Sequence, residues 1–224
     1  MFFKPIFFIL SLVFLTSCGK DSSSDLQDEP EIAETTYTIT FNATWDATTH
    51  PSQDFPDDPH FSPMVGLVHQ TPNQLFELGS FASPGIKLMA ETGNPTTLIS
   101  EGEDLINKKT AHHVFRAGAA FDSPGQDEVT IKVHKDFSLV SVTSMIAPSP
   151  DWFVAAMNVD LIEKGQWLET KVVELFPYDA GTDNGTSFAS PDSITSPPAD
   201  ITKISSDLFQ PDVPLGTFTF TLQK

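Results

Sequence analysis

The sequence contains a single cysteine, Cys18, so no disulfide can form within one chain. The fold must therefore be held by its core, with bound ions as a further source of stability. Basic residues are also scarce: Lys and Arg number 12 against 30 Asp and Glu, and the formal net charge is -18. Because phosphate binding needs a basic surface, this balance excludes nucleic acid as a partner. It fits an extracellular surface that binds cations.

A hydrophobic run follows Lys4 at the N-terminus and ends at Leu15-Thr16-Ser17-Cys18. It is shorter than a membrane-spanning helix of about 20 residues, and its charged start, apolar middle and small-residue end predict a secretory signal peptide, residues 1–17. Its last four residues resemble the lipobox of bacterial lipoproteins, in which the cysteine is acylated and becomes the first residue. An ordinary signal peptide with an incidental cysteine is the alternative. The position of the only cysteine at the cleavage point favours a lipid on Cys18.

Residues 18–35 are polar and acidic, with little to bury, and predict a flexible tether. In the lipoproteins that this N-terminus resembles, an early Lys-Asp pair such as Lys20-Asp21 and an acidic tract accompany export to the outer face of the Gram-negative outer membrane. The prediction is a lipid-anchored outer-membrane protein facing the cell surface. Residues 36–224 fit one folded domain.

Strict alternation of apolar and polar residues over 36–45 predicts a half-buried strand with Tyr37, Ile39 and Phe41 facing a core. Similar β-branched or aromatic runs bounded by Pro, Gly, Asp or Asn predict further strands at 128–133, 137–146, 152–159, 170–176 and 217–222. Residues 95–107 predict a helix. The predicted fold class is all-β: an antiparallel β-sandwich with long Pro/Gly-rich loops and at most one or two short helices.

An acidic loop at 176–185 places Asp179 and Asp183 four residues apart across a glycine. Ca²⁺ takes six to eight oxygen ligands at roughly 2.3–2.6 Å, and a glycine-containing acidic turn can supply some of them. Asp151 lies in a second stiff segment, between Pro150 and Trp152. Alternatively, each aspartate of the loop forms an Asx-turn, in which the side chain only accepts a nearby backbone N–H.

Several segments together resemble the spondin N-terminal domain of F-spondin and many secreted proteins. They occur in the order of that family and cover about residues 36–222: 37–45 (YTITFNATW), 58–63 (DPHFSP), 81–85 (FASPG), 89–93 (MAETG), 144–153 (SMIAPSPDWF), 177–185 (PYDAGTDNG) and 190–191 (SP). The resemblance implies a C2-like β-sandwich that binds calcium at one edge through Asp151, Asp179 and Asp183. Tyr178 stands where the family usually has Trp, and the cysteines of the animal members are missing, so their disulfides do not transfer.

Two further patterns bear on catalysis. Residues 185–191 (GTSFASP) resemble the segment around the nucleophilic serine of subtilisin-like proteases, which would make Ser187 a nucleophile. The family's His-Gly-Thr-His motif and its α/β architecture are missing, so we expect no catalysis at Ser187. The six histidines form no His-Glu-x-x-His zinc motif, and we expect them to be loop or surface residues, with His112 and His113 pointing apart on a strand.

These observations predict a calcium-binding, membrane-anchored lipoprotein that acts as a binding or adhesion module, with no catalytic or cofactor-binding residues. Its expected partners are calcium, the membrane through Cys18, and an extracellular protein or glycan. The alternative is an exported hydrolase that uses the clustered carboxylates, because the separation that glycoside hydrolysis needs is a three-dimensional quantity. Calcium as a purely structural ion also remains open.

Overall fold

Strand β1 (Glu34–Ala43) occupies the interior of a four-stranded antiparallel sheet in the computed structural model. The sheet order is β11 (Thr170–Leu175), β14 (Gly216–Leu222), β1 and β6 (Gly125–His134). The register pairs Phe41 with Phe218 and Ile39 with Phe220, so the apolar residues of both strands share one face. All four are fully buried, as the alternating pattern predicts.

The second sheet is larger and is centred on the long antiparallel pair β7 (Leu139–Ala147) and β8 (Trp152–Asp160). β12 (Pro177–Asp179) and β13 (Thr202–Lys203) extend it beyond β8. Beyond β7, it continues through β2 (His60–Phe61) to β5 (Phe121–Asp122), and through β3 (Val65–His69) to β4 (Ala111–Arg116). A separate hairpin joins β9 (Ile162–Glu163) to β10 (Gln166–Trp167).

Aromatic side chains fill the space between the two sheets. Phe41 of the first sheet lies 4.7 Å, between ring centroids, from both Phe61 of the second sheet and Phe218 of its own. Trp45 packs in turn on Phe61, at 5.9 Å. Large aromatic surfaces of this kind contribute strongly to core stability. The antiparallel β-sandwich predicted from the alternating runs is therefore confirmed.

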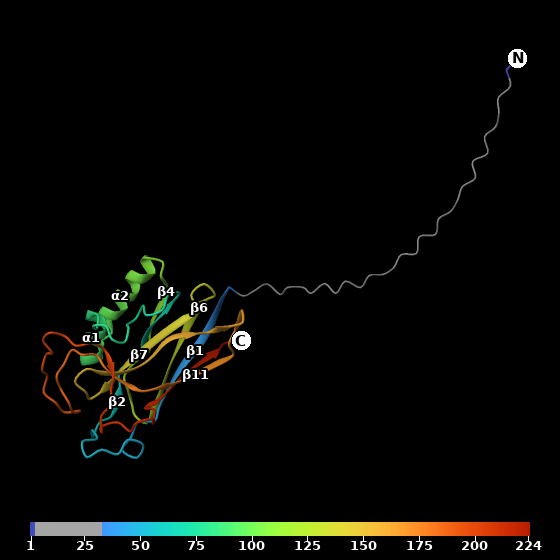
Figure 1. Ribbon diagram of the computed structural model, residues 1–224. Helices are drawn as coiled ribbons and strands as arrows, with labels where there is room; N and C mark the ends of the chain where they lie inside the picture. Colours follow the sequence, from blue (N-terminus) through green and yellow to red (C-terminus); the bar gives the residue numbers. More distant parts are fainter. Residues whose placement is uncertain (3–32) are drawn as a thin grey trace. The chain divides into compact units, whose positions relative to one another are not determined.

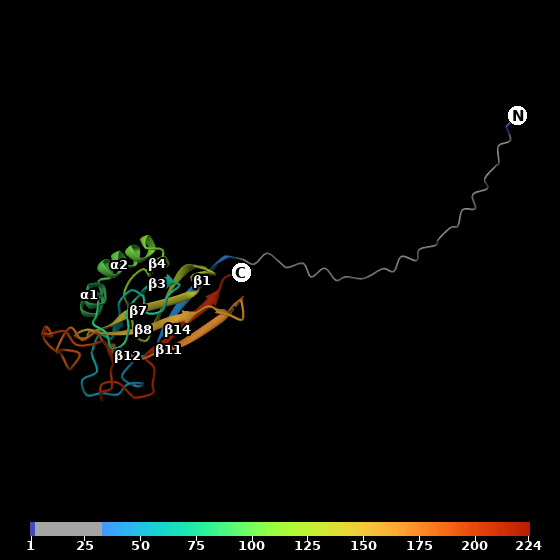
Figure 2. The same ribbon diagram turned by 45° about the horizontal axis from the view of Figure 1, so that its top comes forward.

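Two helices cover the outer side of the second sheet. Figure 2 shows α1 (Pro84–Thr92) and α2 (Thr96–Asn107) on the side of β3 and β7, away from β11 and β14. The predicted helix at 95–107 is confirmed as α2, whereas α1 was not predicted. Its start is held by Glu101 of α2, whose Oε1 accepts the Gly85 N–H at 2.8 Å while its Oε2 accepts the Ser83 hydroxyl at 2.6 Å.

The structure describes residues 1–2 and 33–224, and residues 33–224 belong to one compact unit. Residues 3–17 of the predicted signal peptide, the lipidation site Cys18 and all but the last few residues of the tether lie outside the described residues. Within the described residues, neither helix has the length and apolar character of a membrane span. All six predicted strands are present, as β1, β6, β7, β8, β11 and β14.

Candidate metal centre

Strand pairing brings the two predicted acidic segments together at one end of the second sheet. β12 runs antiparallel to β8, with Asp179 opposite Trp152. The next residue, Ala180, donates its N–H to the carbonyl oxygen of Asp151 at 3.2 Å. Asp151 thus precedes one strand and Asp179 ends its neighbour, so the ladder itself sets the position of both residues.

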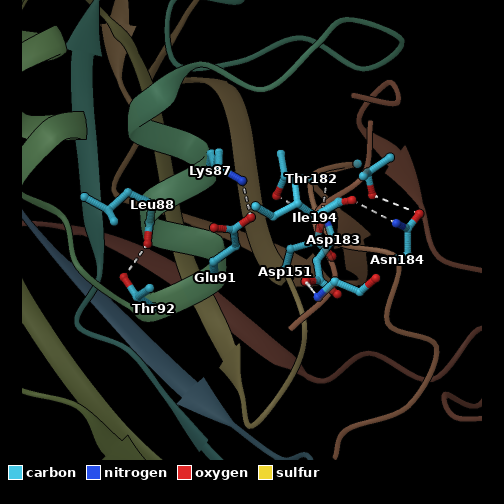
Figure 3. A network of polar contacts seen from close by, with 12 residues as sticks. Lys87, Leu88, Glu91, Thr92, Asp151, Thr182, Asp183, Asn184 and Ile194 are labelled. Carbon is cyan, nitrogen blue, oxygen red and sulfur yellow. Dashed lines mark hydrogen bonds and ion pairs between the residues drawn. The ribbon is translucent and has the colours of Figure 1, made fainter. Parts of the chain in front are cut away.

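Asp151 is fully buried and joins its own segment to the acidic loop. Its Oδ2 accepts three hydrogen bonds: from the Thr182 N–H at 2.7 Å, the Thr182 hydroxyl at 3.2 Å and the Asp183 N–H at 3.0 Å. Figure 3 shows Asp151 beside Thr182 and Asp183, with Asn184 and Ile194 further along the network. The other oxygen, Oδ1, is buried without a hydrogen-bond partner. An unsatisfied buried carboxylate oxygen is costly and points to a missing donor or cation.

Asp179 and Asp183 both form the Asx-turns of the alternative interpretation. Asp179 Oδ1 accepts the Gly181 N–H, and Asp183 Oδ1 accepts the Gly185 N–H, both at 2.7 Å. Asp183 Oδ2 also accepts the Ser193 N–H at 2.6 Å. These contacts orient the carboxylates, and since each carboxylate has about four lone-pair sites, they do not exhaust the ligand capacity of either one.

Two glycines let the loop approach its neighbours closely. Gly181 has φ of +72°, and a Cβ there would lie 2.3 Å from the carbonyl oxygen of Ala199. A Cβ on Gly185 would lie 2.4 Å from the Cγ of Pro150. Trp152, which follows Asp151, is buried in the core. The acidic loop is therefore packed closely on residue 150 at one glycine and on residue 199 at the other.

The electrostatics of the three acids are coupled. The pKa of Asp151 is raised to about 6, chiefly by burial and also by the charge of Asp179, against the opposing hydrogen bonds from Thr182 and Asp183. Burial also raises the pKa of Asp179, and the charge of Asp183 acts in the same direction. Like charges within range of one another raise pKa values in this way, and a divalent cation would reverse the effect.

The side chains do not form a complete set of ligands as they stand. Among residues 33–224, no group of three or more His, Cys, Asp or Glu side chains is arranged to hold a metal ion. Several of the carboxylate oxygens already accept hydrogen bonds: Asp151 Oδ2 and both oxygens of Asp183 accept backbone N–H groups. The three predicted aspartates thus lie on neighbouring segments joined by the hydrogen bonds of Asp151, and carboxylate oxygens of this kind are the ligand type that Ca²⁺ prefers.

Ser187 lies just beyond this loop, and both its side chain and its backbone N–H contact the hydroxyl of Ser190. Its Oγ lies 3.1 Å from the hydroxyl of Ser190, which also accepts the backbone N–H of Ser187 at 3.0 Å. The segment continues without a helix, in contrast to the strand-turn-helix context of a hydrolase nucleophile.

The expectation for the histidines was wrong for His69, which is a buried residue of a strand. His50 lies in a loop, as expected, but is also fully buried. His69 lies on β3, whose residues are all buried because helices cover that side of the sheet, and its Nε2 contacts the Ser141 hydroxyl at 2.9 Å. His50 Nε2 contacts the carbonyl oxygen of Val213 at 3.2 Å. Both act as core hydrogen-bonding residues.

Thr182 and Ser193 contribute to the cluster but were not predicted from the sequence. Thr182 lies between the two predicted aspartates, and its hydroxyl could have been identified as a donor to a carboxylate. Ser193 contributes only its backbone N–H. A backbone contact ten residues along the loop leaves no signal in the residue types.

Comparisons with known proteins find the same domain over most of the chain. A family model described as Spondin_N matches residues 35–215. Spondin-2 of Rattus norvegicus is 36% identical over 191 residues, and the match covers 84% of this chain and 57% of the relative. Spondin-1 of Gallus gallus is 32% identical over 201 residues, which cover 84% of this chain and 25% of the relative. The chain therefore spans little more than half the length of the first relative and a quarter of the second.

Proposed function

Because this chain belongs to the Spondin_N family, we propose that it is an extracytoplasmic binding or adhesion module whose edge binds Ca²⁺ through Asp151, Asp179 and Asp183. The observation that carries the proposal is the Oδ1 of Asp151, a fully buried carboxylate oxygen without a partner between two acidic loops. A bound cation would satisfy this oxygen and offset the repulsion among the three carboxylates. Backbone carbonyls and water would complete the coordination.

In this proposal the ion ties residues 147–152 to residues 178–185. The two loops already share the hydrogen bonds of the Asp151 side chain, and the ion would add a further link between them. A rigid edge lowers the entropy cost of binding a partner there. The module would be anchored to the outer membrane by a lipid on Cys18 and would present this edge to a protein or glycan outside the cell.

Thermal unfolding of the full chain with Ca²⁺ and with a chelator tests the metal site. We expect a higher midpoint with Ca²⁺, because a ligand that binds only the folded state stabilises it by mass action. Asp179→Ala combined with Asp183→Ala should abolish this difference while leaving the far-ultraviolet circular dichroism unchanged. The matched control is Glu103→Ala with Asp104→Ala, which removes the same charge from exposed positions of α2. Equal midpoints with Ca²⁺ and chelator in the parent protein would refute the site.

The anchor is tested separately. Expression in a Gram-negative host with an alkyne analogue of palmitate should label the parent protein, and Cys18→Ser should remove the label. A protein that is exported and cleaved but carries no label would support the ordinary signal peptide instead. The two tests are independent, so either half of the proposal can fail alone.

A further inference from the structure

A cavity of about 320 Å³ lies beside the candidate metal centre. Three loops line it with the residues Asp54, Phe55, Pro56, Asp57, Pro148, Ser187, Phe188 and Ala189. Two of these loops contain motifs to which the calcium site gives no role: the proline- and aspartate-rich stretch 48–63 and the GTSFASP segment at 185–191. The third contributes Pro148, three residues before Asp151.

The apolar part of the cavity wall is held in place by the core. Phe55 and Phe188 pack against the buried ring of Trp45, with centroid distances of 5.2 and 5.5 Å. Phe188 also packs on Trp152 at 5.4 Å, so it links the cavity to the residue that follows Asp151. Pro56 and Pro148 add two rigid rings to the lining. The cavity is thus preformed, which favours binding of a ligand with a flat or extended apolar part.

The charged residues that line the cavity are all acidic. Asp54 and Asp57 are exposed carboxylates, and the lining residues include no Lys or Arg. Ser52 stabilises the turn at residues 52–55. Its Oγ accepts the Asp54 N–H, and its carbonyl oxygen accepts the Phe55 N–H. The net charge of -18 adds a field that attracts cations to such a site. A ligand must therefore bring positive charge next to an apolar surface.

We propose that this cavity binds an arginine side chain of a basic segment in a partner protein. The guanidinium group is planar, stacks on aromatic rings and pairs with carboxylates through two parallel N–H bonds, which suits the half-buried ring of Phe55 and the two exposed aspartates. Phe188 is buried and supports this wall through its contacts with Trp45 and Trp152. Lysine offers only a point charge and fits less well. This inference rests on the proposed function as a binding module and specifies the chemistry of its partner.

The cavity and the candidate metal centre are formed in part by the same two loops. Gly185 of the acidic loop packs on Pro150, and Pro148 and Ser187 extend from these two residues into the cavity wall. An ion that fixes both loops would also fix this wall. We therefore expect arginine binding to be tighter with Ca²⁺ than with chelator, although the lining residues include none of the three metal-site aspartates.

The test uses three short peptides, acetyl-Gly-Ser-X-Ser-Gly-amide, in which X is Arg, Lys or citrulline. Binding to the full chain is followed by the backbone amide signals of Phe188 and Ala189 in ¹⁵N-labelled protein. We expect saturable shifts with the Arg peptide and affinity lower by about tenfold for citrulline, which keeps the shape of Arg without its charge. Asp54→Asn with Asp57→Asn should weaken the Arg peptide by about tenfold.

Glu103→Gln with Asp104→Asn is the matched control, because it changes the net charge equally at exposed positions of α2. Equal weakening by both double variants, or equal binding of Arg and citrulline peptides, would overturn the proposal and indicate a general charge effect or an apolar site. Ala189→Arg gives a second variant on the rim of the cavity, and a folded protein of this kind should lose peptide binding. The thermal unfolding test and the peptide titration together separate the two proposals. Equal thermal midpoints with Ca²⁺ and with chelator, together with saturable binding of the Arg peptide, would refute the metal site alone. A higher midpoint with Ca²⁺, together with no binding of the Arg peptide, would refute the cavity alone.

Discussion

Asp151 Oδ2 accepts the backbone N–H of Thr182 at 2.7 Å, across a sequence separation of 31 residues. This bond joins the segment before β8 to the loop after β12, which are the two parts of the chain that carry the predicted metal ligands. The same carboxylate leaves its second oxygen buried and unpaired. One side chain is therefore both the structural link between the loops and the strongest candidate for a ligand.

The raised pKa of Asp151 predicts a pH dependence of stability in the absence of metal. Its folded pKa of about 6 exceeds the ordinary value of 3.8, so the folded state binds the proton more tightly. This contribution is complete below the unfolded pKa and is lost as the pH rises through 6. In chelator, the free energy of unfolding of the parent should fall by about 1 kcal/mol more than that of Asp151→Asn between about pH 5 and pH 7.5.

Urea unfolding of the two proteins at several pH values measures this difference. Asn keeps an acceptor for Thr182 and cannot ionise, so the variant is a control for shape. With excess Ca²⁺ the trend of the parent should reverse, because the ion requires the ionised carboxylate. Parallel curves for parent and variant in chelator would show that Asp151 does not titrate in this range.

A methyl group at Gly181 should destabilise the acidic loop. Gly181→Ala places a Cβ at positive φ and 2.3 Å from the carbonyl oxygen of Ala199. Gly165→Ala is the matched control, since Gly165 has φ of +78° but nothing within 4 Å of the added atom. We expect a loss of about 1 kcal/mol for the control and about 2–3 kcal/mol for Gly181→Ala in urea unfolding. Equal losses would mean that backbone strain alone requires the glycine.

The sandwich could be predicted from the sequence because its signal is local. Residues 36–45 alternate strictly, and β1 does bury every second residue from Tyr37 to Ala43. β3 was missed for a physical reason: it is buried on both faces, so it shows no alternation, and His69 at its end looks polar although it is part of the core. The strand expected at His112 and His113 is present as β4.

The candidate site could be predicted only as a set of residues. Asp179 and Asp183 stand in a turn-forming sequence, and each does form an Asx-turn. The approach of Asp151 depends on the pairing of β12 with β8, which is a tertiary contact. The cavity beside the site depends on three loops that meet only in the folded chain, and no spacing within one of them indicates it.

Helix α1 also depends on a tertiary contact that the local sequence does not indicate, and this contact gives a testable prediction. Its first turn is capped by Glu101, which accepts hydrogen bonds from Gly85 and Ser83 and lies on the next helix. Glu101→Ala leaves both donors without this acceptor and should lower the free energy of unfolding by about 1–3 kcal/mol. Glu103→Ala, at an exposed position of the same helix, should change it by less than about 0.5 kcal/mol. Similar losses in both variants would show that helix α2, and not the cap of α1, is affected.

His69 predicts a pH dependence opposite to that of Asp151. Its Nδ1 lies 2.7 Å from the carbonyl oxygen of Thr71, so this nitrogen carries the proton, and Nε2 accepts from the Ser141 hydroxyl. Burial lowers the pKa of His69 below 6.5, so its contribution is complete above 6.5 and is lost as the pH falls below that value. His69→Gln should therefore destabilise the protein most near pH 7.5 and less near pH 5. Urea unfolding at both pH values checks this, and a pH-independent loss would show that folding does not lower the pKa of His69.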